Sequence, residues 1–153
     1  MKVYNIRQAG EADIAALLEL CCEHAEYENA SYLLRNQAAG LAEGIFQEPV
    51  RLFCWVVENG NGLAGYCTYT LEYATWKAAH FIHMDCLYLR KDARNQGLGK
   101  ALMEKMILHA RALNIDEIQW QTPDTNVDAI RFYKRIGAMS KKKIRFFLDP
   151  LNY

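Results

Sequence analysis

The sequence predicts an α/β protein in which helices cover both faces of a central mixed sheet. Three observations predict this class. Continuous apolar runs of strand length occupy residues 51–58 and 79–89, as expected for buried strands. The Asn-Gly-Asn-Gly reversal at 59–62 joins the first run to a second strand at 63–71 as a hairpin. Strand and helix patterns alternate after residue 79, which favours a parallel crossover within a mixed sheet.

The first half of the chain adds one strand and two helices. Residues 2–8 (KVYNIRQ) are typical of a first strand. A helix is predicted within 10–27, and a weaker helical pattern covers 38–46. The apolar positions of the first helix are three and four residues apart: Ile14, Leu17, Leu18 and Cys21.

The second half continues with three strands and two helices. The run at 79–89 is almost wholly apolar, so we expect it at the centre of the sheet. A helix begins near Leu98 and keeps its apolar residues on one face. A strand at 116–121, a short helix at 125–137 and a last strand at 141–148 follow.

Length and composition limit the class of protein. The 153 residues suffice for one sizeable core, so we expect a single domain over 1–153. Hydrophobic residues make up 52% and charged residues 24%, which is typical of a soluble globular chain. Eighteen basic and eighteen acidic side chains cancel, and no apolar run approaches the ~20 residues of a membrane span. We therefore expect neither nucleic acid nor membrane as a partner.

The cysteines predict a reducing compartment. Their number is odd, two are adjacent and three lie in apolar runs, which suits buried thiols better than disulfides. They are Cys21, Cys22, Cys54, Cys67 and Cys86. This pattern leads us to expect a cytoplasmic protein. No Cys/His spacing suggests zinc, so we expect no metal.

The stretch 94–102 (RNQGLGKAL) predicts an anion site. Gly97 and Gly99 allow unusual backbone angles and close approach of a ligand, and a helix begins beside them. The N–H groups and positive dipole end of that helix, with Arg94 and Lys100, would suit a phosphate or pyrophosphate. An ordinary strand-to-helix turn is the alternative. A Walker A loop is excluded because Arg94 and Ala101 occupy its glycine and Ser/Thr positions. A dinucleotide fingerprint is excluded because Leu102 stands where its third glycine would be.

Two motifs in order carry a resemblance to a known family. The run HMDCLYLRKDARNQGLGKAL (83–102) reads strand, polar loop, Arg-x-x-Gly-x-Gly, helix, and NVDAIRFYKRIGA (126–138) reads Asn-x-x-Ala-x-x-Phe-Tyr-x-x-x-Gly-Ala. The chain resembles the GCN5-related N-acetyltransferase (GNAT) superfamily. Looser similarity at 23–29 and 69–76 points to its spermidine/spermine (diamine) N-acetyltransferase branch. The resemblance implies the GNAT fold, with a mostly antiparallel sheet of six to seven strands.

The resemblance also implies acetyl-CoA as cosubstrate. The strand before the loop would splay from its neighbour and offer its backbone to the pantetheine arm at Leu87, Tyr88 and Leu89. The pyrophosphate would lie over seven consecutive residues: Arg94, Asn95, Gln96, Gly97, Leu98, Gly99 and Lys100.

Tyr133 matches the family's proton donor to the departing thiolate. Asn126 lies seven residues earlier on the same helical face, so both would contact one extended cofactor. The alternatives are a core aromatic for Tyr133 and a helix cap for Asn126.

Four residues are implied on the amine side. Asp85 is predicted to hold the ammonium ion and take part in its deprotonation, because a carboxylate within a central strand is costly without a partner or a role. A structural salt bridge is the alternative. Tyr27 and Glu28 match a substrate contact of the family, although Glu28 alone would be interpreted as solvated surface. Trp120 is a candidate for the cleft wall.

Other histidines and thiols receive no function from the sequence. His83 and Cys86 are three apart on one strand, so we expect them on opposite faces rather than as a thiol and its base. His24 and His109 lie in helical patterns without an evident partner.

We therefore expect an acetyl-CoA-dependent N-acetyltransferase that transfers acetyl to a primary amine of a small molecule, with a diamine or polyamine favoured. The alternatives are an amino acid, aminoglycoside or protein amine as acceptor, or a non-catalytic acyl-CoA sensor. Lys141, Lys142 and Lys143 replace the acidic residue that the diamine branch tends to carry, and would repel a polycation if they faced the cleft. The resemblance alone implies a homodimer.

Overall fold

The computed structural model describes residues 3–32 and 35–152. The chain divides into two compact units, Met1–Pro123 and Asp124–Tyr153. The first unit contains the entire sheet and three of the α-helices. The second contains helix α4 (Val127–Arg135) and the C-terminal segment.

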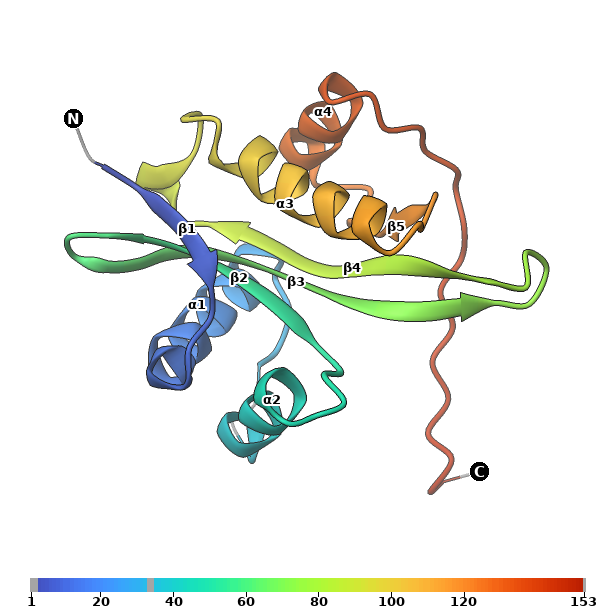
Figure 1. The fold of residues 1–153 in the computed structure, drawn as a ribbon, viewed down its shortest axis with the longest axis horizontal. Helices are drawn as coiled ribbons and strands as arrows, with labels where there is room; N and C mark the ends of the chain where they lie inside the picture. The colour runs from blue at the N-terminus through green and yellow to red at the C-terminus, as the bar shows by residue number, and fades with distance from the viewer. Residues whose placement is uncertain (1–2, 33–34, 153) are drawn as a thin grey trace. The chain divides into compact units, whose positions relative to one another are not determined.

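The first unit is built on a mixed five-stranded sheet. Its spatial order follows the sequence, and the first four strands pair antiparallel while β4 and β5 pair parallel (Figure 1). The strands are β1 (Asn5–Gln8), β2 (Phe53–Asn59), β3 (Gly62–Ala74), β4 (Ala79–Leu89) and β5 (Ile118–Trp120). The predicted class, a mostly antiparallel mixed sheet, is confirmed.

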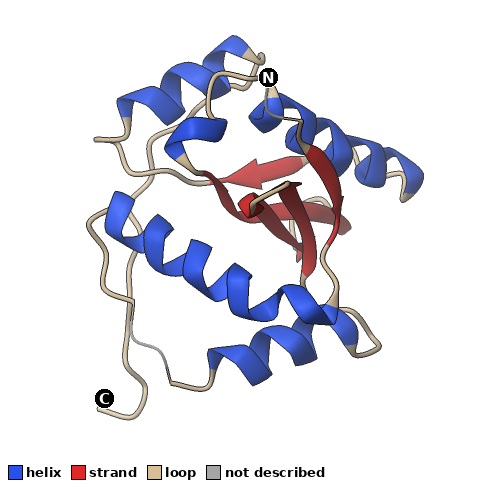
Figure 2. Cartoon of the chain, turned by 90° about the vertical axis from the view of Figure 1, so that its left-hand side faces the viewer, coloured by secondary structure: helices blue, strands red, loops and turns tan. Residues whose placement is uncertain are grey.

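Helices cover both faces of this sheet. Helices α1 (Ile14–Tyr27) and α2 (Gln37–Phe46) lie on one face, and α3 (Leu98–Ala112) lies on the other (Figures 1 and 2). Two short 3₁₀ turns, Glu11–Asp13 and Lys91–Ala93, precede α1 and α3. The amphipathic patterns predicted from the sequence therefore place helices as expected.

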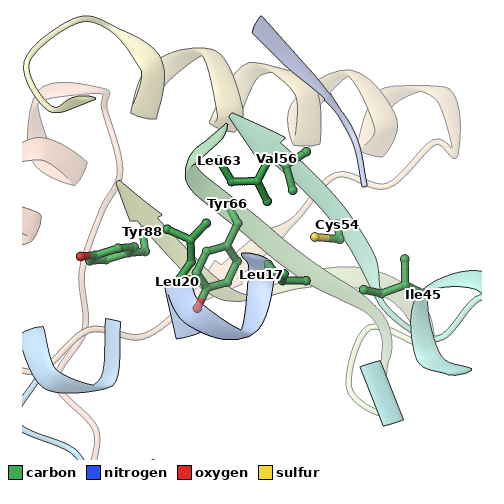
Figure 3. Close-up of a cluster of buried hydrophobic side chains, with 8 residues drawn as sticks. All are labelled: Leu17, Leu20, Ile45, Cys54, Val56, Leu63, Tyr66 and Tyr88. Atoms are coloured by element: carbon green, nitrogen blue, oxygen red, sulfur yellow. The ribbon is translucent and has the colours of Figure 1, made fainter. Parts of the chain in front are cut away.

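The core on the α1 face joins two helices to three strands. Leu17 and Leu20 of α1 are 1% and 0% exposed and pack against Tyr66 of β3 (Figure 3). The cluster comprises Leu17, Leu20, Ile45, Cys54, Val56, Leu63, Tyr66 and Tyr88. All five cysteines are free thiols, as predicted.

A β-bulge at Asp85 changes which face β4 presents. Thr68 pairs with Cys86 and the next residue of β3, Tyr69, pairs with Met84, so Asp85 is the extra residue. A bulge of this kind redirects the side chains that follow it. His83 pairs with Thr70 and Cys86 with Thr68, so His83 and Cys86 lie on the same face, and the prediction of opposite faces was wrong.

The predicted last strand at 141–148 is also wrong. The described residues there form no strand, and the sheet has five strands rather than six or seven. Ile144, Phe146 and Leu148 are 81%, 85% and 73% exposed. Strand propensity does not suffice where no neighbouring strand supplies hydrogen bonds. Lys141, Lys142 and Lys143 are likewise exposed.

Gly65 is required by the close packing of β3 on β4. A Cβ atom added there would lie 2.6 Å from the backbone oxygen of Tyr88 and 2.5 Å from Leu89 Cδ2. We expect Gly65→Ala to lower the free energy of unfolding by about 1–3 kcal/mol, measured by urea titration, because the backbone must shift to relieve the overlap. Gly60→Ala is the matched control, since a Cβ atom there meets nothing within 4 Å. Equal stability of the two variants would contradict this role of Gly65.

Candidate active site

The loop between β4 and α3 forms a cradle of backbone amides. Asn95 and Gly97 have φ angles of 60° and 78°, and Gly97 is the N-cap of α3. No side chain among the described residues caps this helix. The backbone N–H of Ala101 donates to Gly97, so the preceding N–H groups at the helix start have no partner within the helix. Together with the helix dipole, they suit an anion.

Strand β4 extends beyond its parallel partner. The β4–β5 register runs from Ile82 opposite Ile118 to Met84 opposite Trp120 and stops there. On its other side, β4 stays paired with β3 as far as Leu89 opposite Gly65. Among the described residues, no strand pairs with the β5-side edge of β4 from Asp85 to Leu89. Beyond Met84 this edge of β4 therefore has no strand partner in the described part of the chain, and Trp120 lies opposite the last paired residue.

This arrangement fits the parts of coenzyme A that the family binds. The free edge at Leu87–Leu89 offers main-chain groups to an amide-containing arm, and the cradle that follows offers N–H groups to phosphates. Lys100 lies on the first turn of α3 with 68% of its side chain exposed and so can reach an anion. Asn95 and Gln96 are exposed on the loop, and Leu98 and Gly99 are half-buried.

The Arg94 side chain lies over the Tyr27 ring rather than contributing its charge to the predicted anion site. Its guanidinium carbon lies 4.4 Å from the centre of the Tyr27 ring, and its Nε donates to the carbonyl of Leu89 at 2.8 Å. Arg94 thus links the cradle to the end of α1. Its backbone, rather than its guanidinium group, belongs to the anion cradle.

A clamp fixes the end of α1 to the end of β4. Arg90 donates from Nη2 and Nε to the Glu23 carboxylate at 2.7 and 3.0 Å, and from Nη1 to the carbonyl of Leu63 at 2.8 Å. The Tyr88 hydroxyl also donates to Glu23. Tyr27, the last residue of α1, and the adjacent Glu28 are thereby held beside β4.

Asp85 is exposed to solvent. The burial on which its predicted role was argued is absent, and the salt-bridge alternative is not seen among the described residues. The Cys86 thiol donates to Asp85 Oδ2 at 3.6 Å. Asp85 is the bulge residue, beside the last β4–β5 pair. It and Glu28 both act electrostatically on the same imidazole, that of His24.

His24 is the site residue that sequence reasoning missed. Its Nδ1 lies 2.9 Å from the Tyr66 hydroxyl, and its Nε2 lies 3.4 Å from Glu28 Oε1. Burial lowers the pKa of His24, although Glu28 and Asp85 oppose the shift. The four-residue spacing of His24 and Glu28 was the available signal, because residues i and i+4 meet on a helix.

Burial disfavours the thiolate form of two thiols near the site. Burial raises the pKa of Cys86 to about 12 and also raises the pKa of Cys21. A thiol in that range keeps its proton at neutral pH.

Among the described residues, no group of three or more His, Cys, Asp or Glu side chains is arranged to hold a metal ion. Nor does any described helix combine the length and hydropathy needed to span a membrane.

The second unit carries the other motif on α4. The Asn126 side chain accepts a hydrogen bond from the Ala129 N–H at 3.2 Å, so Asn126 is the N-cap, as the alternative held. Tyr133 is half-buried and its ring centre lies 5.2 Å from that of Phe132, so it is not a fully buried core aromatic. The roles of both residues toward the cofactor stay predictions.

Comparisons with known proteins identify the family to which this chain belongs. A family model described as the acetyltransferase (GNAT) family matches residues 13–138. A thialysine N-epsilon-acetyltransferase of Bos taurus is 30% identical over 146 residues, covering 90% of this chain and 85% of that protein. An L-ornithine N5-acetyltransferase of Arabidopsis thaliana is 29% identical over 87 residues, covering 57% of this chain and 38% of that protein.

A solved structure agrees with the fold. A protein described as a transcriptional regulator from Bacillus halodurans C-125 superposes with a TM-score of 0.80 at 22% identity, covering 95% of this chain and 100% of the other. This likeness concerns the fold alone. The chain belongs to the GNAT acetyltransferase family, and it is an acyltransferase enzyme rather than a binding module. Acetyl-CoA is the cosubstrate of that family.

The left-handed conformation of Gly97 makes the cradle sensitive to substitution. We expect Gly97→Ala to weaken coenzyme A binding by about five- to thirtyfold in calorimetry, since this conformation costs a residue with Cβ about 1–2 kcal/mol and the loop relaxes. Gly97→Asn is the matched control, because asparagine tolerates positive φ, as Asn95 does in this loop. Unchanged affinity in Gly97→Ala would show that the cradle does not bind the cofactor.

Proposed function

We propose that this enzyme acetylates the terminal primary amine of a small aminoalkyl molecule, a class that includes diamines, polyamines and lysine-like amino acids. The observation that carries the proposal is that two carboxylates, Glu28 at the end of α1 and Asp85 beside the last β4–β5 pair, act electrostatically on the same imidazole, that of His24. The names of the thialysine and ornithine relatives describe acceptors with a terminal amine. That chemistry is shared by the diamine acceptors expected from the resemblance.

The chain's own residues supply binding and proton transfer. When bound, acetyl-CoA supplies an acetyl group activated as a thioester. Glu28 and Asp85 hold the ammonium form of the acceptor, whose reference pKa is about 10.4, and Asp85 takes part in passing its proton to water. Backbone N–H groups along the free edge of β4 stabilise negative charge on the acetyl oxygen as the neutral amine attacks directly.

Tyr133 is the proposed donor of a proton to the departing thiolate. The assignment rests on its place in the motif 126–138, and Asn126 is proposed to contact the cofactor on the same grounds. Protonation at this point lets coenzyme A leave as the neutral thiol.

The acceptor class can be tested with a thiol-release assay. We expect turnover with acetyl-CoA on diamines, polyamines or lysine and ornithine analogues, and a KM for the amine that rises about three- to tenfold in Asp85→Asn, because a charge-assisted contact is lost. Glu43 is a surface carboxylate on α2 that pairs with Arg51. The substitution Glu43→Gln is the control and should not change KM. Turnover of aminoglycosides alone would refute the aminoalkyl proposal.

Removal of the Tyr133 hydroxyl tests the acid. We expect Tyr133→Phe to lower kcat by about ten- to ten-thousandfold, while the Kd for coenzyme A changes little, because the phenyl ring is retained. Phe132→Leu, at the adjacent position on α4, serves as a control for packing, and should keep most of kcat. An unchanged kcat in Tyr133→Phe would assign the proton transfer to another group.

The proposal includes a homodimer, which the resemblance implies, and a cytoplasmic location, which the odd number and apolar setting of the cysteines favour. Light scattering on the purified protein would report the oligomeric state directly.

A further inference from the structure

A chain of three hydrogen-bonding groups connects the buried core to the proposed amine subsite. Tyr66 on β3 contacts His24 Nδ1, and His24 Nε2 contacts Glu28 one helical turn later. The His24 side chain is 14% exposed and the Glu28 side chain 32%, so the chain runs from a dry interior towards solvent. The His24 ring also stacks on Tyr88, with centres 5.0 Å apart and planes at 21°.

The neighbours of His24 determine which nitrogen carries the proton. Tyr66 is 2% exposed and burial raises the pKa of its hydroxyl, so the hydroxyl keeps its proton and donates to Nδ1. The Cys21 and Cys86 thiols also raise the pKa of that hydroxyl. A carboxylate can only accept, so Nε2 bears the hydrogen and donates it to Glu28. Neutral His24 with its proton on Nε2 satisfies every partner.

Protonation of His24 would disturb this arrangement at both nitrogens. A new N–H on Nδ1 would face the Tyr66 hydroxyl, which would have to turn from donor to acceptor. The imidazolium would form an ion pair with Glu28 and cancel its charge. The titratable and charged groups around the ring are Cys21 and Glu28 from α1, Tyr66 from β3, Asp85, Cys86 and Tyr88 from β4, and Arg94 from the loop.

We propose that His24 is a positioning residue that aims the Glu28 carboxylate at the acceptor amine, and that protonation of His24 in acid releases the cationic acceptor from this subsite. The proposal rests on the proposed function, because it assigns Glu28 to amine binding. Neutral His24 fixes the carboxylate through one hydrogen bond and leaves its negative charge intact. Charged His24 competes with the substrate ammonium for the same oxygen and repels it.

The KM for the amine, measured against pH, tests this proposal. His24→Gln keeps an N–H donor for Glu28 but cannot titrate, and His24→Leu removes the donor. We expect the ratio of KM in the wild type to KM in His24→Gln to rise about two- to fivefold between pH 8 and pH 5.5, because an imidazole whose pKa is lowered by burial is only partly protonated at pH 5.5. Because every variant uses the same amine, the acceptor's own protonation cancels in the ratio. His24→Leu should raise KM about five- to tenfold at pH 8, with kcat and the KM for acetyl-CoA within about twofold of the wild type.

The chain offers a matched control in its other buried histidine–tyrosine pair. His109 on α3 lies 2.9 Å from the Tyr69 hydroxyl through Nδ1, on the opposite face of the sheet, and its ring edge packs against Phe53. His109→Gln should therefore reproduce the wild-type dependence of KM on pH. If His109→Gln changed the profile as His24→Gln does, the effect would be general acid destabilisation and the proposal would be wrong.

A second measurement keeps the test valid if a His24 variant does not fold. Nitrogen-15 NMR of the wild-type protein at pH 8 should show an unprotonated Nδ1 and a protonated Nε2 for His24, and Glu28→Gln should lower the pKa of the imidazole. The opposite tautomer, or a KM ratio independent of pH, would overturn the role of His24 while leaving the enzyme an amine acetyltransferase. A wild-type protein that binds coenzyme A but acetylates no amine would overturn the proposed function, and this proposal with it.

Discussion

Strand β4 is paired with β3 along its length but with β5 only as far as Met84. A buried strand edge must find partners for its N–H and C=O groups, so β4 from Asp85 onward is completed by water or by an extended ligand. The bulge at Asp85 lies where this edge begins, and it places Cys86 and Tyr88 on the α1 face. The placement of Asp85 outside the β3–β4 pairing and of Cys86 and Tyr88 on the α1 face therefore has one origin, a single extra residue in β4.

Besides the free edge of β4, the proposed site requires a fixed distance between β4 and the end of α1. Arg90 satisfies it with a forked contact to Glu23 and a bond to the Leu63 carbonyl, so one guanidinium ties α1, β3 and β4 together. Lysine could not reproduce this fork, because an ammonium lacks its planar geometry. Arg94 adds a second link by lying over Tyr27. Tyr27 and Glu28, the proposed amine contacts at the end of α1, are thus positioned by Arg90 and Arg94.

Much of the fold could be predicted from the sequence because its signals are local. The helical spacing of Leu17, the Asn59–Gly62 reversal and the glycine at the start of α3 each act within a few residues, and the structure confirms them. The bulge at Asp85 was not predictable, because a bulge is a property of two paired strands. The segment 141–148 was wrongly predicted as a strand for the same reason. Its residue pattern indicates a preference for strand conformation but does not indicate whether a neighbouring strand is there to pair with it.

The predicted site residues divide in the same way, into those set by local sequence and those set by contacts that only the fold makes. The cradle at Gly97 was found because it depends on backbone conformation, which a glycine pattern reveals. His24 was missed because its partner Tyr66 is 42 residues away and only the fold brings them together. Asp85 was identified by an argument from burial that does not hold, because the bulge leaves it in solvent.

The cofactor half and the amine half of the proposed site achieve specificity in different ways. Backbone amides hold their direction without help, so a cofactor cradle needs only the correct loop conformation. Carboxylates at the surface are different, because an exposed charge pair contributes at most about 1 kcal/mol and pays side-chain entropy to do so. Glu28 and Asp85 are both largely solvent-accessible, so charge alone would select acceptors weakly. Selectivity then has to come from groups that orient a carboxylate, and buried His24, held by Tyr66 and Tyr88, is placed to do this for Glu28.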